Sequence, residues 1–425
     1  MSIPKIFTKD LVEEYREFFS SDPELIVSAP GRIDFLNTHQ DYKGLPVVGA
    51  AINLRTYVVL GRSRSDENVI ISRNMRDLGE RYVDTFSPDR PEILREKFFG
   101  NYIRASVISL RLKNFEIQPF YAYISSDVSI GSGLGSSGTL LVSLIYGLNQ
   151  LFKLGLDIYQ IAELAYIAEH DVLGIPCGRL DQYTSAFGGV VKIETRPPYE
   201  VENIDFNEGV FIVLDTGIRH STGDIHPKRQ REIDYALELL KNVLPEDLKR
   251  GLGTHYYDTM WEDIDLEKIE HYLINMPYPY GNRILFTLKM QRSTEDALRI
   301  LRGEKIDLEN MSYLVDELRI FLNKKIFLTE DRLKLLGVIM TYQHSLLSRL
   351  YDVSLPTIDL VVKKIIDLGG LGAKISGAGM GGSIIALADD HKKAQKILRR
   401  VLDEKLVSRG WIVRIDEGVR VDERF

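Results

Sequence analysis

The stretch DVSIGSGLGSSGT, residues 127–139, joins a glycine-rich loop to the start of an apolar helical segment. Gly131, Gly133 and Gly135 permit positive φ angles and let a ligand approach backbone N–H groups closely. Apolar residues then recur at helical spacing through residues 140–152. A helix N-terminus gathers unpaired N–H groups and the positive end of the helix dipole, so this stretch indicates an anion site. A nucleotide phosphate is the leading candidate for the anion.

A purely structural interpretation of the same stretch stays open, because a glycine cluster also makes a tight turn that caps a core helix. The loop does not end in the Gly-Lys-Ser/Thr of a Walker A motif. It is also not the G-x-G-x-x-G that follows a strand in dinucleotide-binding folds. The local sequence therefore indicates a phosphate site without deciding the kind of protein.

Size, charge and cysteine content set broad limits. A chain of 425 residues is long enough for two or three domains, and 44% hydrophobic with 27% charged residues is typical of globular proteins. The net charge of −7, without any basic run interleaved with aromatic residues, argues against a nucleic-acid partner. The single cysteine, Cys177, excludes a disulfide framework and fits a reducing compartment. Since no apolar stretch approaches the roughly 18 residues of a membrane helix, we expect a cytoplasmic protein without a membrane partner.

Patterns typical of helices and strands are mixed along the chain without a regular β-α-β alternation, which favours an α+β fold. The pair Pro197-Pro198 predicts a junction between two domains. We therefore expect an N-terminal domain over residues 1–197 and a C-terminal domain over residues 198–425. The second domain carries another glycine turn, GAGMGG, at residues 377–382.

The segment AEHDVLGIPCGRLDQ, residues 168–182, contains two carboxylates that could converge on one site. Glu169 and Asp181 flank a loop that is interrupted by glycine and proline. Asp181 stands where a helix is expected to begin, a position that orients and stabilises an ionised carboxylate. Local sequence alone favours the simpler explanation that Asp181 caps this helix.

Two further segments carry polar or glycine-rich loops at strand ends. In SAPGRIDFLNTHQDY, residues 28–42, Arg32, His39 and Asp41 follow a predicted strand, where ligand contacts are frequent and solvated turns are the common alternative. The turn GAGMGG, residues 377–382, lies between two predicted strands. It is either a glycine hairpin or a backbone cradle for a phosphate or a sugar.

Taken in order, these segments resemble the motifs of GHMP-family small-molecule kinases, and within that family those of the galactokinase branch of sugar 1-kinases. SAPGRIDFLNTHQDY is similar to the galactokinase signature, and IGSGLGSSGT is similar to the phosphate loop. AEHDVLGIPCGRLDQ resembles the segment of the catalytic aspartate, and KISGAGMGG resembles the third family motif. GIRHSTGD and HSLLSRLYDVSLPTID are similar to two further galactokinase segments.

The resemblance extends from about residue 28 to residue 383 and implies a two-domain GHMP kinase fold. The N-terminal domain would resemble the second domain of ribosomal protein S5, and the C-terminal domain would consist of ferredoxin-like α/β layers. The active site would lie between the two. We therefore expect a protein that binds ATP and a small-molecule sugar and that is a monomer or a small homo-oligomer.

The resemblance also implies a role for each chemical residue. Asp181 would face the acceptor hydroxyl and either remove its proton or hold it in line. Arg32 would lie between Asp181 and the γ-phosphate, where it lowers the pKa of the aspartate and stabilises the charge of the transferring group. Ser137 and Glu169 would hold Mg²⁺, a cation that prefers oxygen ligands.

Sugar and phosphate contacts are implied in the same way. His39 and Asp41 would bind sugar hydroxyls. The loop that would wrap the ATP phosphates consists of Gly131, Ser132, Gly133, Leu134, Gly135, Ser136, Ser137, Gly138 and Thr139. The glycines that would let the backbone approach the sugar are Gly377, Gly379, Gly381 and Gly382.

Departures from the galactokinase pattern concern the substrate more than the chemistry. Thr38 stands where galactokinases carry a glutamate that faces the end of the hexose far from C1, and His226 stands where a tyrosine lines the sugar pocket. Asp34 replaces an asparagine, and Gly135 and Gly138 replace serine and alanine. We therefore expect intact phosphoryl transfer, with Thr38 and His226 as candidate substrate-binding residues whose sugar is open.

The expected function is ATP- and Mg²⁺-dependent phosphorylation of the anomeric C1 hydroxyl of galactose or a close relative. One alternative is a 1-kinase for a uronic acid, an N-acetylhexosamine, a deoxyhexose or a pentose, because an altered hydroxyl contact redirects substrate choice. Another is a non-catalytic sensor of sugar and ATP. A mevalonate-type kinase is disfavoured by the polar His39–Asp41 motif and by CGRLDQ, which suit a polyhydroxylated substrate.

Overall fold

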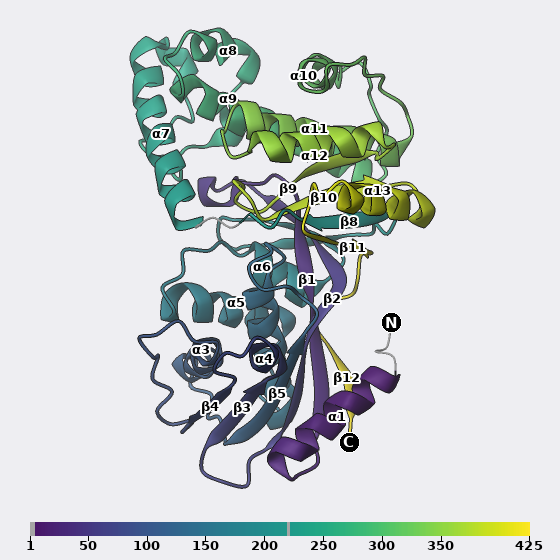
Figure 1. The fold of residues 1–425 in the computed structure, drawn as a ribbon. Helices are drawn as coiled ribbons and strands as arrows, with labels where there is room; N and C mark the ends of the chain where they lie inside the picture. Colours follow the sequence, from purple (N-terminus) through teal and green to yellow (C-terminus); the bar gives the residue numbers. More distant parts are fainter. Residues whose placement is uncertain (1–4, 219–221) are drawn as a thin grey trace.

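A computed structural model of the chain describes residues 5–218 and 222–425 (Figure 1). Within these residues the strands form two sheets. The strands of the larger sheet are β1 (Leu25–Leu36), β2 (Val47–Arg62), β3 (Asn68–Ser72), β4 (Val83–Phe86), β5 (Phe120–Ser126), β6 (Val190–Ile193), β7 (Val201–Ile204) and β12 (Arg420–Arg424). The main path of this sheet is β12-β1-β2-β5-β3-β4, and β6 pairs with both β2 and β7.

The helices of the first half of the chain cover both faces of the larger sheet. They are α1 (Lys5–Phe19), α2 (Arg73–Asp77), α3 (Gly100–Leu112), α4 (Ser136–Phe152), α5 (Ile158–Ile167) and α6 (Leu180–Phe187). Figure 1 shows α3 to α6 gathered on one side and α1 on the other. The predicted apolar face of α4 is buried, since Leu141, Leu144, Ile145 and Leu148 have no exposed surface. This face packs against β1 and β2 and thereby fixes the position of the glycine-rich loop that precedes α4.

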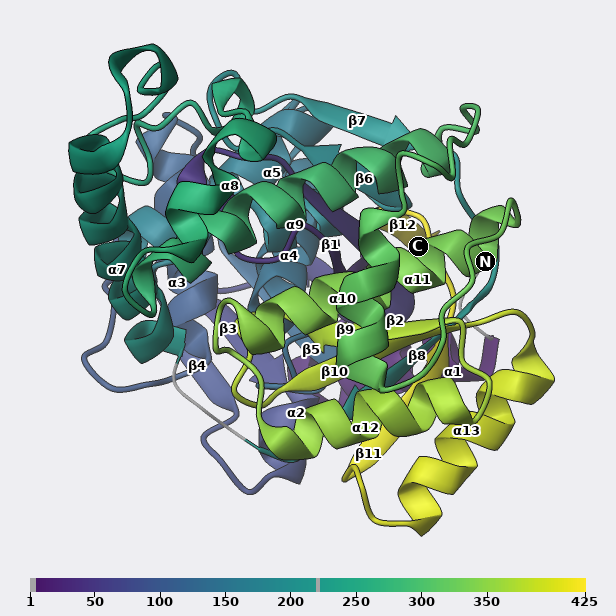
Figure 2. The same ribbon diagram turned by 90° about the horizontal axis from the view of Figure 1, so that it is seen from above.

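The smaller sheet is antiparallel, in the order β11-β8-β10-β9. Its strands are β8 (Val210–Asp215), β9 (Gly372–Ser376), β10 (Ser383–Ala388) and β11 (Arg409–Val413). The accompanying helices are α7 (Thr222–Val243), α8 (Leu266–Ile274), α9 (Tyr280–Leu301), α10 (Tyr313–Leu322), α11 (Arg332–Arg349), α12 (Pro356–Asp367) and α13 (His391–Asp403). The view from above shows α11 and α12 lying across β9 and β10 (Figure 2). Both sheets are mainly antiparallel, with β3 and β5 as the one parallel pair among the described strands, which confirms the predicted α+β class.

The domain boundary between residues 197 and 198 stays a prediction. Strands on both sides of it belong to one sheet, because β7 pairs with β6 in the larger sheet. The end of the chain also returns to that sheet, where β12 pairs with β1. The described segments after residue 198 therefore contribute to both sheets.

Arg55, on β2, holds the returning end of the chain in place. Its guanidinium donates to Asp416 Oδ2 at 2.8 Å, to the Glu417 carbonyl at 2.9 Å and to the Gly418 carbonyl at 2.7 Å. It also donates to the hydroxyl and the carbonyl of Ser28 at 2.8 and 2.9 Å. The side chain is almost completely buried, so these acceptors satisfy a charge that has lost its water.

Replacement of Arg55 by methionine is expected to lower the free energy of unfolding by about 3 kcal/mol, because it removes the donor that Asp416 and three carbonyls share. Urea denaturation followed by tryptophan fluorescence measures the change. In the control Arg16→Met, the lost partner is Asp22, and this ion pair is exposed (52% and 79%). We expect less than about 1 kcal/mol there, and equal losses in the two variants would contradict the role given to Arg55.

Candidate active site

The predicted glycine-rich loop leads directly into a helix, as the sequence indicates. The φ angles of Gly131, Gly133 and Gly135 are 69°, 74° and 75°. Residues with a Cβ atom rarely adopt such positive φ angles, whereas glycine does so readily. Helix α4 begins at Ser136, immediately after the left-handed Gly135. The backbone N–H groups of the first turn of α4 are thus placed to bind an anion.

Arg32 and Asp181 form an ion pair next to this loop. Arg32 lies on β1 and Asp181 in the first turn of α6, and Arg32 Nε donates to Asp181 Oδ1 at 2.7 Å. Arg32 Nη1 donates to the carbonyl of Gly133 in the loop. A Cβ atom on Gly138 would lie 2.9 Å from Asp181 Cβ, so this glycine allows the close approach of α4 to Asp181.

The helix-cap interpretation of Asp181 is wrong. The N-cap residue of α6 is Arg179, and no side chain makes a capping hydrogen bond there. Asp181 lies two residues further on and bonds to Arg32 instead. A partner on a strand 149 residues away has no signature in the local sequence, which is why the cap was the simpler prediction.

Glu169 is the second buried carboxylate near the loop. It belongs to a π-helical segment, Ala168–Val172, and accepts a hydrogen bond from Gln182 Nε2 at 2.6 Å. Burial and the negative charge of Asp181 raise the pKa of Glu169, while hydrogen bonds from Ser137 and Gln182 oppose this shift. Glu169 and Ser137 therefore offer oxygen atoms in a place where a positive charge is favoured.

The third glycine motif packs against the phosphate loop. A Cβ atom on Gly133 would lie 3.4 Å from the carbonyl oxygen of Ser376, and the Ser383 hydroxyl donates to the Ser132 carbonyl. The turn between β9 and β10 includes four glycines with positive φ, which are Gly377, Gly379, Gly381 and Gly382. This turn also contacts the sugar motif, since His39 Nε2 lies 2.9 Å from the carbonyl oxygen of Ala378.

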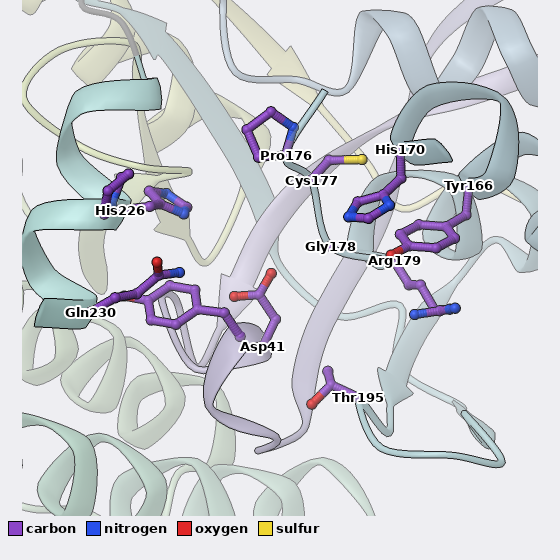
Figure 3. Close-up of a pocket in the computed structure, with 12 residues that line it drawn as sticks. Asp41, Tyr166, His170, Pro176, Cys177, Gly178, Arg179, Thr195, His226 and Gln230 are labelled. Carbon is purple, nitrogen blue, oxygen red and sulfur yellow. The ribbon is translucent and has the colours of Figure 1, made fainter. Parts of the chain in front are cut away.

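A cavity of about 330 Å³ lies beside Asp41 (Figure 3). It is lined by Asp41, Tyr42, Tyr166, His170, Pro176, Cys177, Gly178, Arg179, Thr195, His226, Pro227 and Gln230. In Figure 3 Asp41 stands between a wall with His226 and Gln230 and a wall with His170 and Tyr166. Asp41 and His226 thus meet as predicted, although they are far apart in the sequence.

The carboxylate of Asp41 packs against the segment that carries Asp181. A Cβ atom on Gly178 would lie 2.2 Å from Asp41 Oδ2, so only glycine allows this approach. Burial raises the pKa of Asp41 to about 6, and the nearby charge of Asp34 adds to the shift. At neutral pH the group is a hydrogen-bond acceptor next to the segment that carries Asp181.

Two histidines and a tyrosine form one wall of the site. The ring centroid of His226 lies 5.1 Å from that of His39 and 5.3 Å from that of Tyr42. Burial lowers the pKa of both histidines, so both are neutral at physiological pH. His226 Nε2 is buried and has no hydrogen-bond partner within residues 5–218 and 222–425.

Thr38 is placed differently from the other candidate sugar contacts. It is only 2% exposed, and its hydroxyl accepts a hydrogen bond from Lys374 Nζ at 2.6 Å. Neither Thr38 nor His39 is among the described residues that line the cavity. Of the segment GIRHSTGD, residues 219–221 lie outside the described residues.

Several buried polar residues of the site were missed by sequence reasoning. Lys43 is fully buried, its Nζ donating to Gln40 Oε1 at 2.7 Å and to Thr287 Oγ1 at 2.9 Å, and lying 4.7 Å from the ring centroids of Phe286 and Tyr351. Gln182 and Lys374 were missed as well, although both stand inside quoted motifs. The partners of Lys374 are more than 330 positions away, so no local pattern could have indicated its role. Gln182 bonds to Glu169 across the loop within the segment 168–182, a contact that the spacing of the two residues does not reveal.

The part of the chain that the structure describes contains no cluster of three His, Cys, Asp or Glu side chains that could hold a metal ion. Any cation at Ser137 and Glu169 would therefore need further oxygen atoms from a ligand. Among the same residues, no helix is long and apolar enough to cross a membrane.

The fold and the site together define a class of protein. A glycine loop at a helix N-terminus, an arginine–aspartate pair and a buried glutamate are the parts that phosphoryl transfer needs, and we assign the chain to the small-molecule kinases. Profiles of three protein families match the chain: GHMP kinases N terminal domain over residues 101–189, galactokinase galactose-binding signature over residues 13–62, and GHMP kinases C terminal over residues 326–407. The chain belongs to the GHMP kinase family and is a galactokinase-like member of it.

Alignments with similar proteins extend over nearly the whole chain. A galactokinase of Pyrococcus furiosus is 28% identical over 94% of this chain and 99% of its own length, and one of Thermococcus kodakarensis is 26% identical over 93% and 99%. The structure of Lactococcus lactis galactokinase complexed with galactose matches with a TM-score of 0.76 at 20% identity, over 97% and 99% of the two chains. Methanococcus jannaschii mevalonate kinase matches with a TM-score of 0.64 at 18% identity, over 93% and 99%. The predicted GHMP kinase fold is confirmed.

Cys177 offers a direct test of the electrostatics of the site. Burial and the negative charges of Glu169 and Asp181 raise the pKa of its thiol. The thiolate is the form that reacts. We therefore expect iodoacetamide at about pH 8 to alkylate Cys177 in the folded protein at least about tenfold more slowly than in the unfolded protein. Mass spectrometry follows the reaction of this single cysteine. Glu169→Gln should accelerate it, and equal rates for folded and unfolded protein would contradict this account.

Proposed function

We propose that this protein transfers the γ-phosphoryl group of ATP to the anomeric hydroxyl of galactose or a closely related sugar. The observation that carries the proposal is the Arg32–Asp181 pair, in which Nε and Oδ1 are 2.7 Å apart. Through Arg32 the pair bonds to the phosphate loop, and on its other side Gly178 brings Asp41 and the cavity to the same segment. A carboxylate with its arginine therefore stands where a phosphate site and a polar cavity meet.

The chain's own residues supply positioning and charge. Asp181 would accept the proton of the sugar hydroxyl or hold that hydroxyl in line with the γ-phosphate. Arg32 holds Asp181 through their 2.7 Å hydrogen bond and would stabilise the negative charge that spreads over the transferring group. The first turn of α4, with Ser136, Ser137 and Thr139 behind Gly135, would bind the phosphates of ATP. Held in this way, the two reactants need little further reorganisation.

Ser137 and Glu169 fit a magnesium ion. Both offer oxygen atoms. Burial and the negative charge of Asp181 raise the pKa of Glu169, and a bound cation would relieve the repulsion between the two carboxylates. When bound with ATP, Mg²⁺ neutralises the β- and γ-phosphate charges. Gln182 holds Glu169 in place through its 2.6 Å hydrogen bond.

Asp41, His39 and His226 are the proposed sugar contacts. Asp41 and His226 both line the cavity, Asp41 as an acceptor. The buried Nε2 of His226, which has no partner among the described residues, would gain one from a sugar hydroxyl. The glycines of the third motif, with His39 bonded to Ala378, would form the backbone side of the pocket. The cytoplasmic location and a monomeric or small homo-oligomeric state stay predictions.

The proposal is tested by an ATP-consumption screen of the purified protein with Mg²⁺. We expect turnover with galactose above that with galacturonate, N-acetylgalactosamine, fucose, arabinose, glucose or mannose, and none with mevalonate. Phosphorus NMR should identify the product as a sugar 1-phosphate. Preference for another sugar would replace galactose in the proposal. Binding of galactose and ATP without any turnover would favour the sensor interpretation.

The control for this screen is Asp181→Asn, which keeps the shape of the side chain and removes its charge. We expect a loss in kcat of about 10² to 10⁴, because a positioned acceptor for the proton is missing. Binding of ATP, measured by calorimetry, should change little. Unchanged kcat in this variant would show that Asp181 takes no part in the reaction.

The pH dependence of sugar use should report on Asp41. Its pKa, raised to about 6 by burial, means that the carboxylate is protonated as the pH falls through that value and no longer accepts two hydrogen bonds. We therefore expect KM for the sugar to rise from about pH 7 to about pH 5, while KM for ATP follows other groups. Asp41→Asn should have a higher KM with a flatter profile. An unchanged slope in the variant would contradict the assignment.

A further inference from the structure

A buried polar cluster joins the sugar motif to the third glycine motif. Lys374, on β9, has no exposed surface, and its Nζ donates to Thr38 Oγ1 at 2.6 Å and to the Asp34 carbonyl at 2.8 Å. The backbone N–H of Asp34 donates to Ser376 Oγ at 3.0 Å. Strand β1 of the larger sheet is thereby tied to β9 of the smaller sheet.

One atom of this cluster lacks a partner. Asp34 is 5% exposed, and its Oδ1 accepts no hydrogen bond from any of the described residues. A buried carboxylate oxygen without a donor costs free energy, so such an atom requires an explanation. The neighbouring ammonium of Lys374, whose pKa burial lowers only to about 8, is charged at neutral pH and balances the charge of Asp34 without bonding to Oδ1.

Asp34 lies within electrostatic reach of both sides of the proposed reaction site. Burial raises the pKa of Asp34 and the charge of Asp181 adds to this shift, while Lys374, Arg32 and a hydrogen bond from Thr38 oppose it. Burial also raises the pKa of Asp41, and the charge of Asp34 adds to that shift. Along β1, residues two apart point to the same face, so Asp34 shares its face with Arg32, which bonds to Asp181. The carboxylate of Asp34 therefore lies on the face of β1 that carries Arg32, next to the Arg32–Asp181 pair.

We propose that Asp34 is a third carboxylate of the sugar site and that its Oδ1 accepts a hydrogen bond from a sugar hydroxyl other than the one that faces Asp181. Lys374 and Thr38 act as positioning residues that hold this carboxylate. The assignment rests on the proposed sugar kinase function and goes beyond it by naming a residue that selects the substrate.

The same arrangement favours a neutral sugar over a uronic acid. Asp34 balances the positive charge of Lys374, so this ammonium is not available to a substrate carboxylate. Arg32 is likewise committed to Asp181. Arg179, the cation among the described residues that line the cavity, is paired with Glu163. A uronate would therefore meet the charges of Asp34 and Asp41, and its own charge would be repelled.

The test couples removal of the acceptor to removal of each sugar hydroxyl. Asp34→Ala and the wild type are assayed with galactose and with its 2-, 3-, 4- and 6-deoxy derivatives. We expect the wild type to discriminate against one deoxy sugar by about tenfold or more in kcat/KM, because that sugar leaves Oδ1 unpaired. In Asp34→Ala the discrimination against that sugar should largely disappear, and the ratios for the others should stay the same. Equal loss with galactose and all deoxy sugars would overturn the proposal.

Asp34→Asn, which preserves shape, keeps the test valid if the alanine variant folds poorly. Loss of the charge should raise kcat/KM for galacturonate relative to galactose by about tenfold. A matched control is Asp84→Asn, since Asp84 is a buried carboxylate bonded to Arg104 outside the site. It should lower thermal stability without changing any ratio between sugars. A wild type that phosphorylates no sugar would refute the proposed function itself, whereas unchanged ratios in both Asp34 variants would refute only this assignment.

Discussion

The ion pair between Arg32 and Asp181 is the interaction on which the arrangement of the site depends. It joins β1 to α6, and the bond from Arg32 to Gly133 adds the loop before α4. The arginine side chain is 9% exposed and the aspartate 26%, so both charges are largely removed from water and each needs the other. Loss of either partner would leave an uncompensated charge beside the phosphate loop. The pair therefore fixes the orientation of Asp181 before any substrate is present.

Around this pair the site contains several carboxylates, and positively charged side chains near it are bonded to other protein groups. Asp41, Glu169 and Asp34 lie near Asp181, and mutual repulsion together with burial raises the pKa of all three. Two cations near the site bond to the protein itself: Arg32 bonds to Asp181, and Lys374 bonds to Thr38 and the Asp34 carbonyl. The resulting environment favours ligands that bring hydrogen-bond donors or a divalent cation, and a polyhydroxylated sugar with magnesium and ATP satisfies both conditions.

How far the sequence predicts this site depends on the distance between partners. The loop at residues 131–139 and the helix after it follow from local pattern, since glycine spacing and apolar periodicity are properties of a short stretch. Resemblance to a family implies the roles proposed for Arg32 and Asp181, whereas local sequence alone favoured a helix cap for Asp181. Lys374 and Thr38, which share a hydrogen bond, are 336 positions apart in the sequence, and no motif predicts this contact. Contacts that depend on the meeting of two sheets could be obtained only from the structure.

The alternating side-chain directions of strand β1 allow a short segment to contribute both to the hydrophobic core and to the candidate active site. Ile33 and Phe35 point into the hydrophobic core that includes the smaller sheet, and both are fully buried. The alternation of a strand then places Arg32 and Asp34 together on its other face. A one-residue slip of this strand would exchange the two sets, burying charges in the core and removing both from the site. Packing of the apolar pair thus holds the register that keeps the arginine of the transfer centre and the carboxylate proposed for sugar recognition side by side.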